Sequence, residues 1–124
     1  GVDQADVREK ILKAYQKGGL QPPYFREVVK TLNADPKRTK EVLMHLVEEG
    51  HIVKTKEDLY FHAKAVDELK GRLVEFLKSH GEITTPQFKE MTGSSRKYVI
   101  PLIEYFDSKN VTLRIGDSRK LRRG

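Results

Sequence analysis

Residues 94–124 read SSRKYVIPLIEYFDSKNVTLRIGDSRKLRRG, and this stretch decides how the rest of the chain can be interpreted. Val99, Leu102, Ile103 and Phe106 recur at the spacing of one helix face, and a polar, basic run precedes them. Two strand-like segments, VTLRI and RKLR, then flank the sequence Gly-Asp-Ser at 116–118. A glycine at the first turn position suits a tight hairpin, where φ must be positive. The stretch therefore predicts a helix with a basic start, a hairpin and a basic tail.

Pro101 conflicts with this helix, because a proline inside a helix removes a hydrogen bond and costs about 3 kcal/mol. Either the helix is kinked at the proline, or residues 94–98 form a turn that is separate from the helix. The regular apolar spacing from Val99 to Phe106 favours keeping the helix.

The charge of the chain is unevenly distributed. The 124 residues have a formal net charge of +6 and an isoelectric point near 9.5. Residues 1–66 carry twelve basic and ten acidic residues, a net of +2, whereas residues 67–124 carry twelve and eight, a net of +4. From residue 108 onward there are six basic residues and one acid. This surplus favours an acidic partner, nucleic acid or an anionic membrane surface, for the second half.

The composition argues against several classes of protein. No cysteine is present, and no apolar run approaches the roughly 18 residues of a membrane span. No signal-peptide pattern is seen at the start, so we expect a soluble, cytoplasmic protein without a membrane partner. Because the sequence starts at Gly1 rather than at Met, we also expect a part of a longer protein.

The sequence offers no arrangement of residues for catalysis or metal binding. His45, His51, His62 and His80 are scattered, and none pairs at the spacing of a helical metal site. Neither a glycine-rich phosphate loop nor a serine with a nearby histidine is found. We therefore expect neither enzymatic activity nor a metal or cofactor.

The first half predicts three helices followed by a hairpin. The first helix spans Asp3 to Lys17 with Asp3 as its cap, and a short helix covers residues 25–32. A third starts with Asp35 as cap and Pro36 at the first helical position, and Gly50 is placed to end it in a left-handed conformation. The segments HIVK and LYFH then read as strands around a loop at 55–58.

The same order recurs in the second half. A helix at 67–79 ends at Gly81, and Glu82-Ile83 forms a brief strand. Thr85 caps a short helix that Gly93 ends, and Ser94 caps the helix described above. The repeat predicts a mainly α fold with small β-hairpins (α+β), organised as two tandem winged-helix modules. Their expected bounds are 1–66 and 67–124, joined near residues 64–67 by only a few residues.

A nucleic-acid site is predicted where the third helix of the second module begins. The N-terminal end of this helix in a helix-turn-helix points toward the groove or backbone, and its N–H groups and dipole favour a phosphate. Five residues at this helix start can contact a nucleic acid: Ser94 and Ser95 through hydroxyls, Arg96 through its guanidinium, Lys97 through its charge, and Tyr98 through a ring on which a base can stack. The hairpin and tail add Arg114, Arg119, Lys120, Arg122 and Arg123.

The equivalent helix start in the first module is also basic, but an aspartate occupies its cap. Its hairpin loop, Thr-Lys-Glu-Asp at 55–58, is close to neutral. We therefore interpret the first module as a spacer or docking module, with a weak backbone contact from Lys37, Arg38 and Lys40 as its only expected nucleic-acid role.

The run SRKYVIPLIEYFDSKNVTLRIGDSRKLR at 95–122 closely resembles the C-terminal end of the bacterial selenocysteine-specific elongation factors (SelB). The shared pattern is a basic SRK-Y start, an internal proline, an LEYFD-like helix end and a VT-R-GD hairpin. The resemblance implies that the last winged helix binds the selenocysteine insertion hairpin of an mRNA and meets the ribosome through the full-length factor. Nothing of the family's GTP-binding part is present in the sequence.

The resemblance also implies specific contacts. The helix start at 94–98 would meet the RNA backbone and loop, while Arg114, Gly116 and the tail at 119–123 would brace the hairpin. Lys89 on the short helix is a further candidate. One residue departs from the family, because Leu113 stands where an arginine is common in the first of two adjacent wing positions.

Two other functions remain open at this point. A double-stranded DNA-binding regulator would use the same surface in a major groove, and it predicts a dimer and a palindromic site. A protein–protein module would use the tail only for solubility. We expect a monomer that binds structured RNA, with contacts to backbone and loop because the A-form major groove is too narrow for a helix.

Overall fold

The computed structural model describes residues 4–56 and 58–122. The chain divides into two compact units, residues 1–66 and residues 67–124. Within the described residues, no helix combines the length and the apolar character that crossing a membrane requires.

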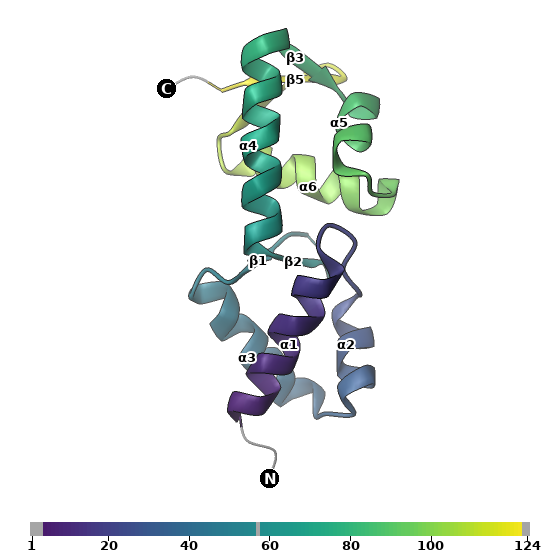
Figure 1. Cartoon of the computed structure of the whole chain (residues 1–124), viewed down its shortest axis with the longest axis vertical. Helices are drawn as coiled ribbons and strands as arrows, with labels where there is room; N and C mark the ends of the chain where they lie inside the picture. Colours follow the sequence, from purple (N-terminus) through teal and green to yellow (C-terminus); the bar gives the residue numbers. More distant parts are fainter. Residues whose placement is uncertain (1–3, 57, 123–124) are drawn as a thin grey trace. The chain divides into compact units, whose positions relative to one another are not determined.

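The first unit has the predicted order of three helices and a hairpin (Figure 1). Its elements are α1 (Gln4–Gly18), α2 (Phe25–Leu32), α3 (Pro36–Glu48), β1 (Ile52–Lys54) and β2 (Tyr60–His62). The two strands pair antiparallel. The predicted cap Asp3 lies outside the described residues.

The predicted start of α3 is confirmed. The Asp35 carboxylate accepts a hydrogen bond from the backbone N–H of Arg38 at 3.0 Å, and Pro36 occupies the first turn. At the other end, Gly50 has φ of +84°, a conformation that a side chain would strain. The cap, the proline and the glycine therefore act as the sequence pattern indicated.

The core of the first unit contains Ile11 and Tyr15 from α1, Leu43 and Leu46 from α3, and Tyr60 from β2. All five are almost fully buried. The Tyr15 ring meets the Tyr60 ring edge-on, with centroids 6.4 Å apart. The Tyr15 hydroxyl is buried without a hydrogen-bond partner, which is an unusual cost in a small core.

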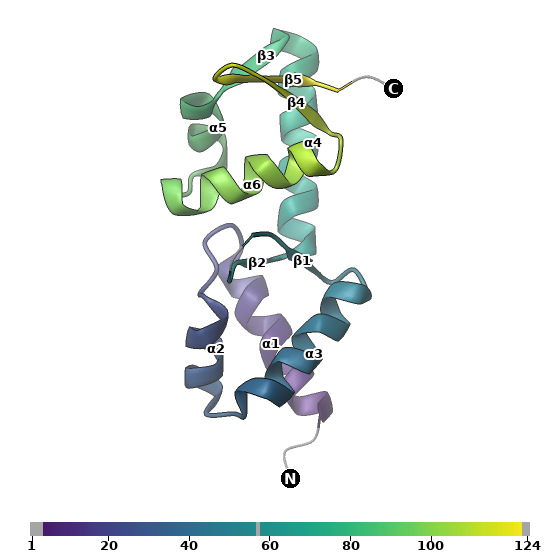
Figure 2. The same ribbon diagram turned by 180° about the vertical axis from the view of Figure 1, so that it is seen from behind.

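The second unit places three helices against a three-stranded antiparallel sheet of order β3-β5-β4 (Figure 2). Its elements are α4 (Ala63–His80), β3 (Glu82–Thr84), α5 (Thr85–Thr92), α6 (Arg96–Ser108), β4 (Thr112–Ile115) and β5 (Ser118–Leu121). The predicted strand at Glu82-Ile83 is confirmed, and it pairs with β5. The predicted core stripe of α6 (Val99, Leu102, Ile103 and Phe106) is buried.

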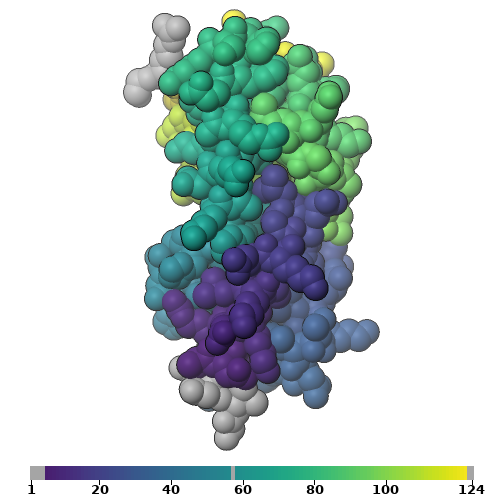
Figure 3. Space-filling view, in the orientation of Figure 1, coloured from purple at the N-terminus to yellow at the C-terminus, as the bar shows by residue number. Residues whose placement is uncertain are grey.

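The two modules are expected to join near residues 64–67 through only a few residues. Those residues are helical, because α4 begins at Ala63 directly after β2 ends at His62. No glycine or proline interrupts residues 63–70, and Val66, Leu69 and Leu73 are buried at helical spacing. Figure 3 shows α4 as a teal surface that faces the viewer on the side drawn.

Two predicted caps in the second unit are each one residue away from the observed ones. Thr84, not Thr85, caps α5: its hydroxyl accepts from the Gln87 N–H, and the Gln87 side chain accepts from the Thr84 N–H at 2.9 Å. This reciprocal pair is a capping box, and it moves Pro86 to the second helical position. Ser95, not Ser94, is the N-cap of α6.

Pro101 lies inside a single helix, so residues 94–98 do not form a wholly separate turn. It is the sixth residue of α6, and its missing N–H cannot donate to the carbonyl of Lys97. The β4–β5 turn consists of Gly116 and Asp117 alone, since Ser118 pairs with Ile115. Gly116 has φ of +61°, as the predicted tight hairpin requires.

Candidate nucleic-acid interface

The start of α6 exposes three of the five residues that were predicted to bind there. Ser95, Arg96 and Lys97 are exposed, and they occupy the N-cap and the first two helical positions. The Ser95 hydroxyl makes no capping hydrogen bond, while its carbonyl accepts from the Tyr98 N–H at 3.0 Å. First-turn N–H groups and two cations thus lie at the positive end of the helix dipole, an arrangement that favours a phosphate.

The other two residues, Ser94 and Tyr98, belong to the interior. Ser94 is 5% exposed, and its N–H donates to the Thr92 hydroxyl at 3.1 Å. Tyr98 is 9% exposed because it lies one turn before Leu102 on the buried face of α6. The expected base stacking on Tyr98 is therefore corrected, since little of its ring is accessible. The four-residue spacing from Tyr98 to Leu102 in the sequence could already have predicted that Tyr98 is buried.

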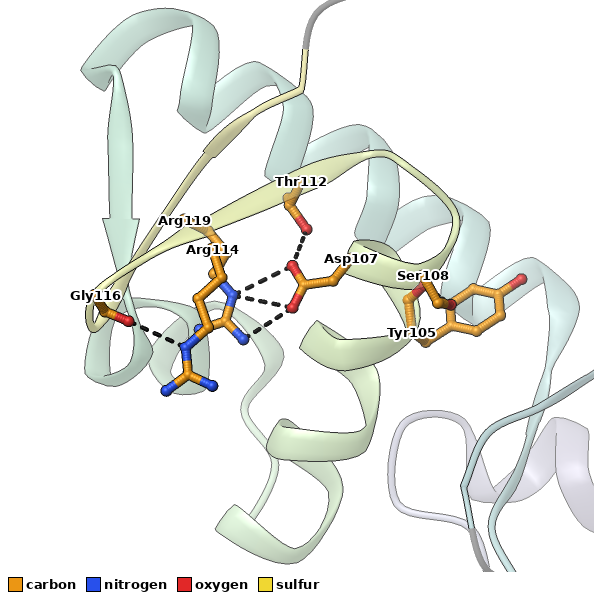
Figure 4. Close-up of polar contacts among 7 residues, drawn as sticks. All are labelled: Tyr105, Asp107, Ser108, Thr112, Arg114, Gly116 and Arg119. Atoms are coloured by element: carbon orange, nitrogen blue, oxygen red, sulfur yellow. Dashed lines mark hydrogen bonds and ion pairs between the residues drawn. The ribbon is translucent and has the colours of Figure 1, made fainter.

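Asp107, near the C-terminal end of α6, bonds to both strands of the β4–β5 hairpin (Figure 4). Its carboxylate accepts from the Thr112 hydroxyl at 2.6 Å. It also accepts three hydrogen bonds from Arg119, at 2.9 Å from Nη2 and at 3.2 and 3.3 Å from Nε. The Arg119 side chain is only 7% exposed. Arg119 is thus corrected from an RNA-contact residue to the partner that holds the hairpin on α6.

The hairpin tip keeps one cation accessible. Arg114 is exposed, and its Nε donates to the Gly116 carbonyl at 3.1 Å, as Figure 4 shows. That bond curls the side chain back over the turn and leaves the two terminal nitrogens of the guanidinium for another acceptor. Gly116 itself serves the turn through its positive φ.

Three further predicted cations are exposed in the second unit, namely Lys120, Arg122 and Lys89. Lys120 lies on β5, Arg122 follows it, and Lys89 lies on α5. The Arg122 N–H donates to the Val111 carbonyl at 3.0 Å, so the strand pairing continues one residue past β5. The predicted residue Arg123 lies outside the described residues.

The structure adds two residues that the sequence reasoning missed. Leu113 and Ile115 on β4 are 44% and 49% exposed, unusually accessible for large aliphatic side chains. Side chains alternate between the two faces of a strand, so Leu113 and Ile115 point to the face opposite the buried Thr112. The alternation in the sequence could therefore have predicted their exposure.

The first unit uses its basic helix start differently. Lys37 and Arg38 are exposed, but the Lys40 ammonium lies 4.5 Å from the ring centre of Phe25 and 5.1 Å from that of Tyr60. Such cation–π contacts stabilise the packing of α3 on its own unit. Of the three, Lys40 therefore has a structural role.

The titration shifts lie away from the start of α6. Burial first, and the Asp67 charge second, raise the pKa of Tyr105 above its usual value. Burial first, then the charges of Lys64 and His51, lower the pKa of His62. Among residues 4–56 and 58–122, no group of three or more His, Cys, Asp or Glu side chains is placed to hold a metal ion.

Residues 75–121 match the protein family described as "Elongation factor SelB, winged helix". The selenocysteine-specific elongation factor of Desulfomicrobium baculatum is 33% identical over 121 residues, which cover 98% of this chain and 19% of that protein. The one from Escherichia coli K12 is 26% identical over 110 residues, covering 89% and 18%. The chain thus spans about a fifth of the length of these relatives.

Two solved structures share the fold. The mRNA-binding domain of elongation factor SelB from E. coli in complex with SECIS RNA superposes with a TM-score of 0.82 and 24% identity, over 97% of each chain. A bacterial selenocysteine-specific elongation factor superposes with a TM-score of 0.74 and 24% identity, over 98% of this chain and 20% of the other. The predicted fold class is confirmed, and the chain is similar to the winged-helix, mRNA-binding domain of the selenocysteine-specific elongation factor SelB.

Proposed function

We propose that residues 67–124 bind the selenocysteine insertion hairpin of an mRNA as the RNA-reading part of a longer elongation factor. The exposed start of α6 carries the proposal, because Ser95, Arg96 and Lys97 present a hydroxyl, a guanidinium and an ammonium around first-turn N–H groups. The similar E. coli domain was solved in complex with SECIS RNA.

The chemistry of these residues suits RNA backbone and loop rather than a helical groove. An A-form major groove is too narrow for α6 to enter, so its end would meet phosphates and unpaired nucleotides. Arg114, Lys120 and Arg122 would add backbone contacts from the hairpin, and Lys89 would add one from α5. About four neutralised phosphates would give a slope of log affinity against log salt of order −3 to −4.

The remaining parts of the proposal follow from this role. The first unit, residues 1–66, acts as a spacer or docking module, and the chain binds RNA as a monomer without catalysing a reaction. The ribosome is reached through the longer factor, in the cytoplasm where translation takes place.

A competition experiment tests the proposal. The full chain is bound to a labelled selenocysteine insertion hairpin, and unlabelled hairpin or duplex DNA of matched length is added. We expect the hairpin to compete and the duplex to compete poorly. A preference for the duplex would instead support a DNA-binding regulator, and the absence of any hairpin binding at moderate salt would support a protein–protein module.

A further inference from the structure

The outer face of the β3-β5-β4 sheet carries an aliphatic pair, Leu113 and Ile115. In the sheet register Leu113 lies opposite Lys120, and Ile115 lies opposite Ser118. Directly paired residues of antiparallel strands point to the same face, so these four side chains share one surface. The opposite face holds Thr112 and Arg119, which are buried.

The charges around the pair favour an anionic partner. Arg122 lies two residues after Lys120 and points to the same face, because the strand pairing continues past β5. There the Arg122 N–H donates to the Val111 carbonyl. Arg114 lies between the two aliphatic residues in the sequence, but it pairs with Arg119 and therefore points to the opposite face. Among the described residues, the carboxylate on this face of the sheet is Glu82, which pairs with Lys120 from the far strand β3 and is separated from β4 by β5. A second exposed carboxylate, Asp117, lies in the β4–β5 turn. An aliphatic surface bordered by the two cations Lys120 and Arg122 fits a nucleotide better than an apolar peptide.

We propose that Leu113 and Ile115 pack against the base and ribose of an unpaired nucleotide in the bound RNA hairpin, while Lys120 pairs with its phosphate. Aliphatic side chains have no hydrogen-bonding group, so this contact holds the nucleotide without reading which base it carries. The pair differs in kind from the α6 contacts, which are ionic and polar. This inference rests on the proposed function, since it names a second contact to the same RNA.

The test compares a double variant, Leu113→Ser with Ile115→Thr, with the unmodified chain. Both new side chains are polar and suit an exposed strand, so the hairpin should keep its fold. We expect affinity for the insertion hairpin to fall about fivefold to tenfold, as expected for lost burial of a small aliphatic surface. The salt slope should stay unchanged, whereas Lys120→Gln should reduce it by about 0.7 to 0.9.

The nucleotide is identified with hairpins in which each loop or bulge position is replaced in turn by an abasic residue. At one position, the abasic hairpin should bind the unmodified chain and the double variant with nearly equal affinity, because the base that the two side chains contact is then absent. Val53→Thr, on the corresponding hairpin strand of the first unit, is the matched control and should bind normally.

The outcomes separate this inference from the proposed function. If the unmodified chain binds the hairpin and the double variant binds equally well, the apolar contact is refuted and the α6 site stands. If the double variant binds more weakly than the unmodified chain with every abasic hairpin, the contact with a base is also refuted. If the unmodified chain fails to bind the hairpin at all, the proposed function itself has failed.

Discussion

Arg119 on β5 donates three hydrogen bonds, from its Nε and Nη2, to the carboxylate of Asp107 on α6, the shortest of them at 2.9 Å. The arginine side chain is 7% exposed and the aspartate side chain 25% exposed. A cation so enclosed, with its fork already occupied, has little capacity for an RNA phosphate. The same carboxylate holds Thr112, so a single group fixes both strands of the hairpin.

Removing the Arg119 side chain should therefore destabilise the second unit. We expect Arg119→Ala to lower the free energy of unfolding by about 1.5–3 kcal/mol, the range for hydrogen bonds to charged groups. Denaturant unfolding measures the change, and hydrogen exchange of the β4 and β5 amides should localise it. Lys120→Ala, an exposed neighbour on the same strand, is the control and should change stability little. Unchanged stability with lost RNA affinity would return Arg119 to the binding site.

Arg96 should matter for RNA binding and not for folding. We expect Arg96→Ala to weaken hairpin binding by about 1–3 kcal/mol, taking the range for a bidentate contact, with no change in thermal stability. Lys37→Ala removes an exposed charge from the first turn of α3 in the other unit and is the matched control. Equal affinities for the two variants would contradict the assignment of the interface to α6.

The observed capping box of α5 predicts a difference between two adjacent threonines. Thr84→Ala should cost about 1 kcal/mol of stability, because the Gln87 N–H loses its side-chain acceptor. Thr85→Ala, inside the helix, should cost little, since alanine is the better helix former. Thermal unfolding of the two variants provides the measurement, and the reverse order would place the cap at Thr85.

The buried hydroxyl of Tyr15 should reduce the stability of the first unit. Its hydroxyl lacks a hydrogen-bond partner, and burial first, then the charges of Asp58 and Tyr60, raise its pKa well above the usual value of 10.0. We expect Tyr15→Phe to be neutral or stabilising by up to about 1 kcal/mol, since the buried hydroxyl is removed without breaking a bond.

The raised pKa of Tyr15 also gives a pH dependence. The folded state keeps the proton while the unfolded chain releases it above pH 10.0, so this contribution to stability is present below that pH and falls as the pH rises further. Between pH 10 and 11 the Tyr15→Phe variant should lose less stability than the unmodified chain. Parallel losses in the two proteins would show that Tyr15 ionises equally in both states.

The sequence by itself determined the elements and their order, because the signals are local. Helix periodicity, the Asp35-Pro36 start and the glycines at 50, 81 and 116 report on neighbouring residues only. The cap positions in the second unit were missed by one residue for the same reason, since adjacent threonines and serines carry equal capping signals. The SRK-Y start and the internal proline carried the resemblance to the family.

Only the tertiary structure decided which basic residues are available for binding. Arg119 and Arg114 look alike in the sequence and pair with each other in the sheet, yet Arg119 bonds to Asp107 and is buried, whereas Arg114 is exposed near the hairpin tip. Tyr98 was judged by its place beside Arg96 and Lys97, whereas the packing of α6 buries it. Charge and ring type belong to the residue, but accessibility depends on contacts between segments distant in the chain.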